Sequence, residues 1–280
     1  MTASGSLELR AGLHVVDEGA GEPVVLVHGN PTSSHLYRRF VPALAAAGYR
    51  AIAPDHLGFG RSPKGGGDLS LPAHAQRFAA LMEELALDDV TLVLHDWGGP
   101  IALDWALANP ERVKRLVFFN TVAWALRARR PPRAYAILSA PLLGELLVKR
   151  AHAVVRWGLL RRLPQRPIDD PGPYLAAHPR PADRASILAL IRAVPESLRE
   201  GPARDLLERV GAGLPSLAGK PVLIAWGMRD PILTPRVLRG FRERFPHAEV
   251  HELEEAGHFL QEDAHERLVP LLVDWLRRTP

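Results

Sequence analysis

The sequence predicts an α/β protein built on a mostly parallel, doubly wound sheet, and two patterns lead to this fold class. First, short apolar runs rich in β-branched residues recur along the chain. Each run is continuous rather than alternating, which suits strands that are buried on both faces of a parallel sheet. Second, the segments between the runs keep apolar residues at helical spacing. Alternation of strands and helices favours a sheet covered by helices on both faces.

These patterns place six strands and five helices in the sequence. The predicted strands comprise residues 23–27, 50–53, 90–94, 115–119 and 221–226, with a weaker last strand at 248–251. The predicted helices comprise residues 34–47, 71–85, 99–109, 235–245 and 264–278. Several strands end at polar residues that a buried strand has no packing need for. Functional side chains are therefore expected at the carboxyl ends of the strands.

Residues 124–214 interrupt the alternation of strands and helices. This region is rich in Pro and Arg, has helical stretches at 134–139 and 142–155, and contains no clear strand run. An insertion at the carboxyl end of a strand lies over the crevice where such sheets bind ligands. We therefore expect a core formed by residues 1–123 and 215–280, with residues 124–214 as a helical cap.

Composition excludes several classes of protein. A chain of 280 residues with 47% hydrophobic and 24% charged residues has enough apolar side chains to fold unaided. Cysteine is absent, which excludes disulfides, thiolate metal sites and a cysteine nucleophile. No apolar run approaches the roughly 20 residues of a transmembrane helix, and the first ten residues lack a signal-peptide pattern. We therefore expect a cytoplasmic protein without a transmembrane segment.

The charge of the chain is concentrated in the predicted cap. Residues 124–184 contain 12 basic and 4 acidic residues, a net charge of +8, whereas the whole chain carries +4. A basic patch suits either nucleic acid or acidic lipid. No nucleic-acid motif accompanies it, and aromatic residues make up only 6% of the chain. We therefore interpret the region as a solvated basic surface and expect no nucleic-acid partner.

The most specific motif is Leu94-His95-Asp96-Trp97-Gly98-Gly99, where a strand runs through small residues into a helix. This is the pattern of a nucleophile elbow, a tight turn that raises one side chain above the sheet. The central residue here is Asp96. An aspartate at this point is also a common helix N-cap, so capping is the alternative interpretation of the motif.

Two later residues complete a catalytic order. Asp230 follows the strand at 221–226, and His258 follows the last predicted strand. Nucleophile, acid and histidine in that order along the chain are typical of α/β-hydrolase triads. The segment His28-Gly29-Asn30-Pro31 follows the first long buried strand, where such enzymes place an oxyanion-hole loop. The same residues are also simply good turn formers.

Four segments together resemble the haloalkane dehalogenases. They are His28-Gly29-Asn30-Pro31, Asp55-His56-Leu57-Gly58-Phe59-Gly60-Arg61-Ser62, His95-Asp96-Trp97-Gly98-Gly99 and Gly257-His258-Phe259-Leu260-Gln261-Glu262-Asp263. Epoxide hydrolases are similar at several of these motifs. The resemblance covers about residues 10–123 and 215–280, and the cap is similar only in length and helical character.

The resemblance implies a role for each matched residue. Asp96 corresponds to the nucleophile, His258 to the base and Asp230 to the acid. Asn30 and Trp97 correspond to the paired halide donors, and their backbone N–H groups to an oxyanion hole. In another branch of the family the acid is a glutamate at the place of Asn120, so this chain is similar to the branch with Asp230. That branch also includes enzymes that open β-lactones, so the resemblance leaves the substrate open.

The expected reaction is hydrolysis of a carbon–halogen bond through an ester of Asp96, giving alcohol and halide. Its partners are a small apolar substrate, water and a halide ion. The alternatives are a β-lactone hydrolase or decarboxylase on the same site, an epoxide hydrolase using Tyr135 and Tyr174 of the cap, and a scaffold reused for binding. No triad member is missing, which disfavours the last. We expect no cofactor, and the twelve histidines show no HExxH spacing, so we expect no metal.

Overall fold

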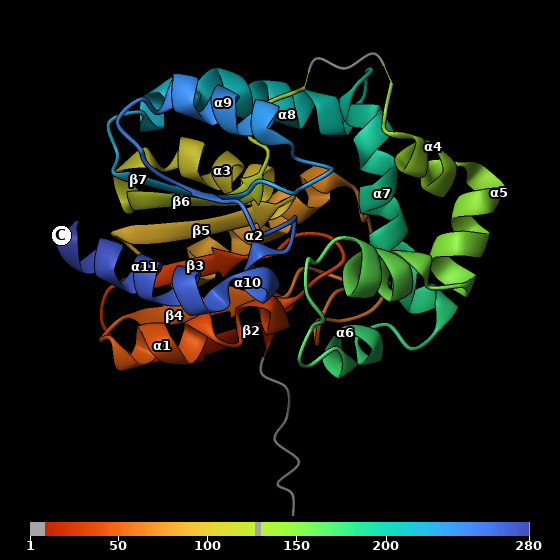
Figure 1. The fold of residues 1–280 in the computed structure, drawn as a ribbon, viewed down its shortest axis with the longest axis horizontal. Helices are drawn as coiled ribbons and strands as arrows, with labels where there is room; N and C mark the ends of the chain where they lie inside the picture. The colour runs from red at the N-terminus through yellow and green to blue at the C-terminus, as the bar shows by residue number, and fades with distance from the viewer. Residues whose placement is uncertain (1–8, 127–129, 280) are drawn as a thin grey trace, which may run out of the picture.

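The computed structural model describes residues 9–126 and 130–279, and its described part contains one eight-stranded sheet (Figure 1). The strands are β1 (Leu9–Arg10), β2 (Leu13–Glu18), β3 (Pro23–Val27), β4 (Arg50–Pro54), β5 (Val90–Asp96), β6 (Val113–Thr121), β7 (Val222–Gly227) and β8 (Glu249–Leu253). Their order is β1-β2-β4-β3-β5-β6-β7-β8. All neighbours from β4 onward are parallel, which confirms the predicted fold class.

The six predicted strands are all present, with ends within two residues of the prediction. β1 and β2 were not predicted. They form the antiparallel edge of the sheet, and β2 is only partly buried, with its last two residues exposed. Its sequence mixes apolar and polar residues, so it lacks the continuous apolar run that marks the central strands.

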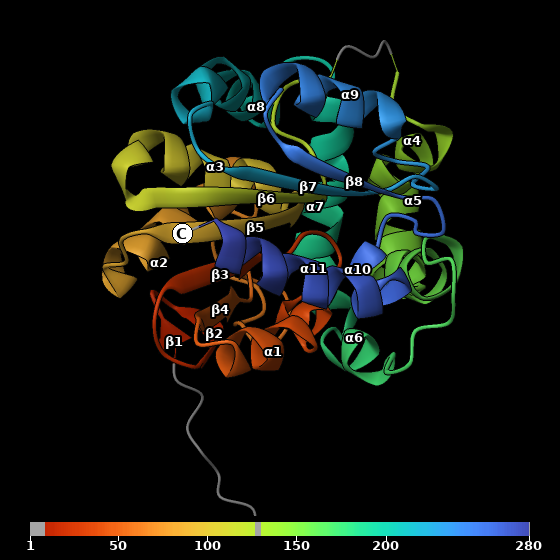
Figure 2. The ribbon, with the colours of Figure 1, turned by 60° about the vertical axis from the view of Figure 1, so that its left-hand side comes forward.

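Helices cover both faces of the sheet (Figures 1 and 2). On one face α1 (Phe40–Ala46) packs beside α11 (His265–Arg278), and on the other α2 (Leu71–Leu85), α3 (Gly98–Ala108) and α8 (Pro202–Gly213) pack together. Two more helices, α9 (Pro235–Arg244) and the short α10 (Leu260–Asp263), flank β8 along the chain.

The predicted helix at 34–47 is wrong as a single element. The structure instead has a short 3-10 turn, η1 (Ser34–Tyr37), followed by α1. Pro42 explains the break, because its nitrogen has no hydrogen to donate to a preceding turn. Starting the helix at Phe40 places Pro42 in the first turn, where the N–H would be unpaired in any case.

The described elements of the region from 124 to 214 are all helical, as predicted, and non-helical segments connect them. It contains α4 (Arg133–Ser139), α5 (Pro141–Gly144), η3 (Glu145–Arg150), η4 (Val154–Arg162), α6 (Gly172–Ala176), η5 (Pro181–Arg184), α7 (Ala185–Ser197), α8 and η6 (Leu214–Leu217). The predicted continuous helix at 142–155 is wrong, because His152 has a φ of 56° and ends it. η3 and η4 are π-helical, with i→i+5 bonds such as Leu163 N–H to the Gly158 carbonyl.

The last helix of this region lies against the core. α8 contacts α2 and α3, and a side chain at Gly213 would meet Leu107. By contrast, α4 and α5 lie at the outer edge of the molecule, beyond α7 (Figure 1). The division into a core and a cap with a boundary at residue 214 stays a prediction.

One buried carboxylate ties the cap region to the core. Glu262 of α10 accepts two hydrogen bonds from the Arg38 guanidinium, at 2.6 and 2.8 Å, and one from the Tyr174 hydroxyl of α6, at 2.6 Å. Burial alone would raise the pKa of Glu262, but these donors lower it. The pairing holds α6 beside the start of α10, which follows directly after His258.

No helix in the described ranges combines the length and apolar character needed to cross a bilayer.

We predict that Gly98→Ala destabilises the protein. A Cβ at this first residue of α3 would collide with the backbone carbonyl oxygens of Val27 and His28, which cannot move without disturbing β3. We expect a loss of about 1–3 kcal/mol in the free energy of unfolding, measured by urea denaturation. Gly158→Ala is the control, since nothing lies within 4 Å of its added Cβ. Equal stability of Gly98→Ala and wild type would contradict this packing argument.

Candidate active site

Asp96 lies on a strained turn between β5 and α3. Its φ is 50°, a left-handed value that few non-glycine residues adopt. Gly29 and Gly99 make room for the turn, because a Cβ at Gly29 would collide with the Asp96 carboxylate and one at Gly99 with Thr121. The residue at the N-cap of α3 is Trp97, and no side chain caps this helix. The capping interpretation of Asp96 is therefore wrong, and the elbow is confirmed.

His258 lies between two carboxylates that come from different strands. Its Nδ1 is 2.7 Å from Asp230 Oδ2, and its Nε2 is 3.4 Å from Asp96 Oδ2. Asp230 follows β7, and His258 lies between β8 and α10. The imidazole is only 1% exposed. The structure thus brings the three residues of the predicted triad together at the carboxyl edge of the sheet.

The charges in this group stabilise one another. Burial would lower the pKa of His258, but the charges and hydrogen bonds of Asp230 and Asp96 raise it to about 10. Burial would likewise raise the pKa of each aspartate, but interactions with His258 lower both. The resting site therefore holds an imidazolium between two ionised carboxylates.

Asn120 is part of the site, although the sequence indicated it only as the position where another branch of the family has a glutamate. Its Nδ2 donates to Asp230 Oδ2 at 2.8 Å, and its Oδ1 accepts from the Gly227 N–H at 2.7 Å. The backbone N–H groups of Ile232 and Leu233 donate to the other oxygen of Asp230. Asp230 is therefore fixed from both sides. Its polar position at the end of β6 was the available signal.

His95 fixes the loop that carries His258. Burial lowers the pKa of His95 to about 4, so its ring is neutral. Its Nε2 is 2.9 Å from the His258 carbonyl oxygen and therefore carries the hydrogen that is donated to it. The structure confirms the expectation that His95 is a hydrogen-bonded part of the scaffold.

Two backbone N–H groups face the Asp96 carboxylate. The Asn30 N–H donates to Asp96 Oδ1 at 2.8 Å, and a backbone hydrogen bond from Trp97 helps to lower the pKa of Asp96. Donors in these positions would stabilise negative charge on an oxygen of Asp96 if its carbonyl carbon were attacked. The geometry expected of an oxyanion hole is therefore present.

The side chains of Asn30 and Trp97 differ in what they contact. Asn30 Nδ2 donates to the Ile187 carbonyl of α7 at 3.3 Å, while its Oδ1 is buried without a partner. The Trp97 indole N–H makes no hydrogen bond within the described residues, and its ring lines a cavity together with Asp96. Trp97 thus offers a free donor to a ligand, and Asn30 offers the second hydrogen of its amide.

The cavity at Asp96 is small and mostly apolar. Its volume is about 340 Å³, and its lining comprises Asp96, Trp97, Val122, Leu126, Arg130, Pro131, Pro132, Tyr135, Val194, Ser197, Leu198, Leu207, Ile232 and Leu233. A second cavity of about 730 Å³ shares Pro132, Tyr135 and Ile232 with it and extends under α4 and η4. The site is therefore suited to an apolar molecule with few polar atoms.

Tyr135 and Tyr174, the two cap tyrosines considered from sequence, have different surroundings. Tyr135 lines the cavity beside Asp96, whose negative charge adds to burial in raising the pKa of the phenol. Tyr174 donates its hydroxyl hydrogen to Glu262 instead. Only Tyr135 is therefore positioned to donate to a ligand in the cavity.

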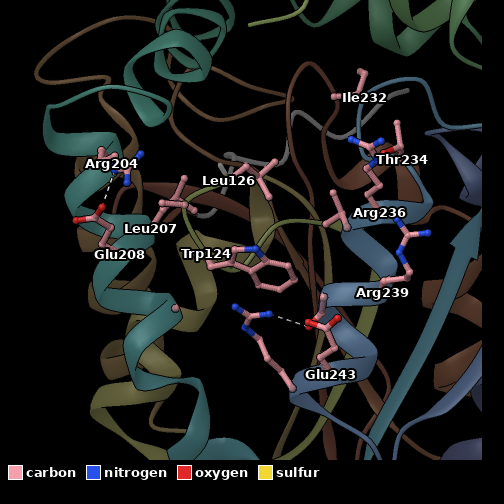
Figure 3. A pocket seen from close by; sticks show the side chains of 15 residues that line it. Trp124, Leu126, Arg204, Leu207, Glu208, Ile232, Thr234, Arg236, Arg239 and Glu243 are labelled. Atoms are coloured by element: carbon pink, nitrogen blue, oxygen red, sulfur yellow. Dashed lines mark hydrogen bonds and ion pairs between the residues drawn. The ribbon is translucent and has the colours of Figure 1, made fainter. Parts of the chain in front are cut away.

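A separate hollow of about 740 Å³ lies between α8 and α9 (Figure 3). Its walls carry charged side chains, among them Arg204, Arg236, Arg239 and Glu243. It shares Leu126, Leu207 and Ile232 with the cavity at Asp96, so these side chains separate the two. None of the triad residues lines this hollow.

Among residues 9–126 and 130–279, no group of three or more His, Asp or Glu side chains has the arrangement of a metal site.

The fold and the site define a hydrolase of the α/β class whose elbow residue is a carboxylate. Comparison with known proteins agrees. The family model described as "alpha/beta hydrolase fold" matches residues 22–265. The chain is 37% identical to a cis-3-alkyl-4-alkyloxetan-2-one decarboxylase of Shewanella oneidensis, covering 95% of this chain and 86% of that protein. It is 35% identical to haloalkane dehalogenase 1 of Mycobacterium bovis, covering 100% and 92%.

A solved structure shows the same relation. The haloalkane dehalogenase DatA of Agrobacterium tumefaciens C58 superposes with a TM-score of 0.86 at 30% identity, covering 96% of this chain and 93% of that one. The chain belongs to the α/β-hydrolase family and, within it, to the haloalkane dehalogenase group.

We predict that Asp230→Asn lowers the pKa of His258 by more than about one unit, because the variant removes the largest favourable charge at the ring. NMR titration of the imidazole nitrogens measures this directly. Asp274→Asn, an exposed site on α11, is the matched control and leaves the titration unchanged. A His258 pKa that is equal in wild type and Asp230→Asn would show that Asp230 does not hold the charge of the ring.

Proposed function

We propose that this protein hydrolyses carbon–halogen bonds of small haloalkanes through an ester on Asp96. The ionised carboxylate attacks the halogen-bearing carbon in line with the leaving halide, forming the carbon–oxygen bond as the carbon–halogen bond breaks. No base is needed to activate a group that is already charged. The lowered pKa of Asp96 and its place on the cavity wall support this role.

The second half-reaction returns the carboxylate. Forming the ester removes the negative charge of Asp96, so one of the groups that raises the pKa of His258 is lost. His258 can then release its proton and act as a base toward water. Water attacks the carbonyl carbon of the ester, the N–H groups of Asn30 and Trp97 stabilise the oxyanion, and the alcohol leaves. Asp230 orients the ring and stabilises the imidazolium.

The leaving halide requires donors in an apolar cavity. The free indole N–H of Trp97 is the single observation that favours a halide over other leaving groups, because it has no partner within the described residues. The second hydrogen of the Asn30 amide is the other proposed donor, although Asn30 is not among the residues that line the cavity at Asp96. Neutral N–H donors stabilise a developing anion without the tight ion pair that would slow its release.

The substrate, halide and water are the proposed partners, and we keep the cytoplasm as the expected compartment. The absence of cysteine from the chain is compatible with a reducing environment.

The first test is release of bromide from 1-bromobutane or 1,2-dibromoethane. We expect wild type to release bromide and Asp96→Ala to lose more than about a thousandfold of the rate, since it lacks the nucleophile. His258→Phe should stop after ester formation, so mass spectrometry should find the alkyl adduct on the peptide that contains Asp96. Arg239→Gln, on the hollow between α8 and α9, is the control with normal turnover. No bromide from wild type across a panel of bromoalkanes would refute dehalogenation.

A second candidate is opening of a β-lactone followed by loss of CO₂. The 37% identity to an oxetan-2-one decarboxylase favours it, as does Arg130, a cation on the cavity wall. Asp96 attacks the saturated ring carbon that bears the ring oxygen, so a new carbon–oxygen bond forms as the bond to the ring oxygen breaks, which gives an alkyl ester of Asp96 and a free carboxylate. Loss of CO₂ then passes its electron pair into a new carbon–carbon double bond and expels the Asp96 carboxylate. Water is not consumed in this reaction.

The two candidates predict different products from one enzyme preparation. With a cis-dialkyl β-lactone, the second candidate predicts an alkene and CO₂, whereas simple hydrolysis predicts a hydroxy acid. Gas chromatography of the headspace and extract distinguishes them. We expect His258→Phe to lose hydrolysis more than decarboxylation, because only hydrolysis needs a base for water. An inert β-lactone together with bromide release would eliminate this candidate.

Epoxide hydrolysis is disfavoured by the position of Tyr174, whose hydroxyl is bound to Glu262. Full activity of a variant with both Tyr135 and Tyr174 changed to Phe would exclude it.

A further inference from the structure

Large apolar side chains are exposed almost exclusively in one segment of the described chain. In the described residues six such side chains are exposed, and five of them lie between residues 137 and 157. They are Ile137, Leu142, Leu143, Leu146 and Trp157, which we call the cap face. Leu142 is 86% exposed and Trp157 is 61% exposed. Of the elements that carry them, α4 and α5 lie on the side of α7 away from the sheet (Figure 1).

Exposed cations accompany these apolar side chains. Residues 133–163 contain six basic residues and one acidic residue. The acidic residue, Glu145, is already paired with Lys149 and Arg192. Arg156 and Arg161 flank Trp157 on η4, are exposed, and form no ion pair with any residue in the described ranges. The cap face therefore combines apolar side chains with uncompensated positive charge.

Two residues of the cap face line a cavity that borders the one containing Asp96. Ile137, Trp157 and Gly158 line the cavity of about 730 Å³ under α4 and η4. That cavity shares Pro132 and Tyr135 with the smaller one that contains Asp96. The larger cavity thus meets the one at Asp96 at these two residues, between the exposed side chains and the nucleophile.

These observations point to one occupant. A second copy of the chain seated on this face would bring two positively charged surfaces together, which opposes association. Nucleic acid would satisfy the arginines but leave five apolar side chains in water. Only an anionic bilayer surface satisfies both, since leucine and tryptophan enter the interface while arginine contacts lipid phosphates.

We propose that the cap face binds the surface of bilayers that contain anionic lipid, and that apolar substrates enter the active site from that surface. The binding of lipid is independent of the reaction, whereas the route of entry rests on the proposed function. Under this proposal, anionic lipid is the ligand of the basic surface that composition led us to expect. The protein binds peripherally, by side chains of short helices rather than by a spanning segment.

The test is flotation with vesicles of phosphatidylcholine alone and of phosphatidylcholine with phosphatidylglycerol at a 7:3 ratio. We expect wild type to float with the anionic vesicles at low salt, and the bound fraction to fall at least about fivefold with neutral vesicles or at high salt. Bromine atoms on the lipid acyl chains should quench Trp157, the one exposed tryptophan among six. Trp157→Phe should remove the quenching.

Two double variants and two controls test the assignment to the cap face. Leu142→Ser with Leu146→Ser, and Arg156→Gln with Arg161→Gln, should each reduce vesicle binding about tenfold or more. Leu9→Ser and Arg236→Gln with Arg239→Gln change an exposed leucine and two exposed arginines elsewhere, and should bind as wild type. Neither double variant lines the cavities, so bromide release from soluble 1-bromobutane without vesicles should stay normal.

Three outcomes would overturn the proposal. Wild type that stays unbound with anionic vesicles at low salt would refute it outright. Binding that both double variants retain would place the contact elsewhere. A dimer in light scattering that Leu142→Ser with Leu146→Ser converts to a monomer, without vesicle binding, would make the cap face an interface between copies. None of these results bears on bromide release in buffer, so the two proposals fail separately.

Discussion

The structure of the active site depends on one buried imidazolium held between two carboxylates. His258 lowers the pKa of both Asp96 and Asp230 against the effect of burial, and the two carboxylates in turn raise the pKa of the ring. Three segments that are far apart in the sequence must therefore end at the same edge of the sheet. Parallel β5, β7 and β8 bring them there, and Asn120 and His95 fix two of them further.

The sequence could predict those features of the site that depend on short, local sequence patterns. Continuous apolar runs identified the buried strands, and polar residues directly after them identified Asp96, Asp230 and His258. Interactions that depend on distant partners were not accessible. Asn120 reads as a polar strand end until Asp230, 110 residues later, is seen to accept its hydrogen bond. The edge strand β2 was not predicted, because a partly buried strand has no continuous apolar run in its sequence.

The cap region shows where composition stops being informative. The sequence showed that the region has an excess of arginine, but it did not show which of these arginines form ion pairs. The structure separates Arg166, bound to Glu266, from Arg156 and Arg161, which make no ion pair in the described part of the chain. The break at His152 likewise depends on a left-handed backbone that no helical pattern foretells. That the exposed Arg156 and Arg161 belong to the same short helix as Trp157, which lines a cavity, is visible only in the folded structure.

Asn30 connects the chemistry of the core to the placement of the cap. Its backbone N–H contacts the Asp96 carboxylate, and its side chain contacts the Ile187 carbonyl on α7. A chimaera that received its cap from a relative would therefore inherit more than a new cavity shape. A shift of α7 would remove the carbonyl to which the Asn30 amide is bonded and, under the proposed mechanism, change the donors available to a departing anion. Under the proposed mechanism, a change of cap that alters selectivity for the substrate's carbon skeleton also alters affinity for its leaving group.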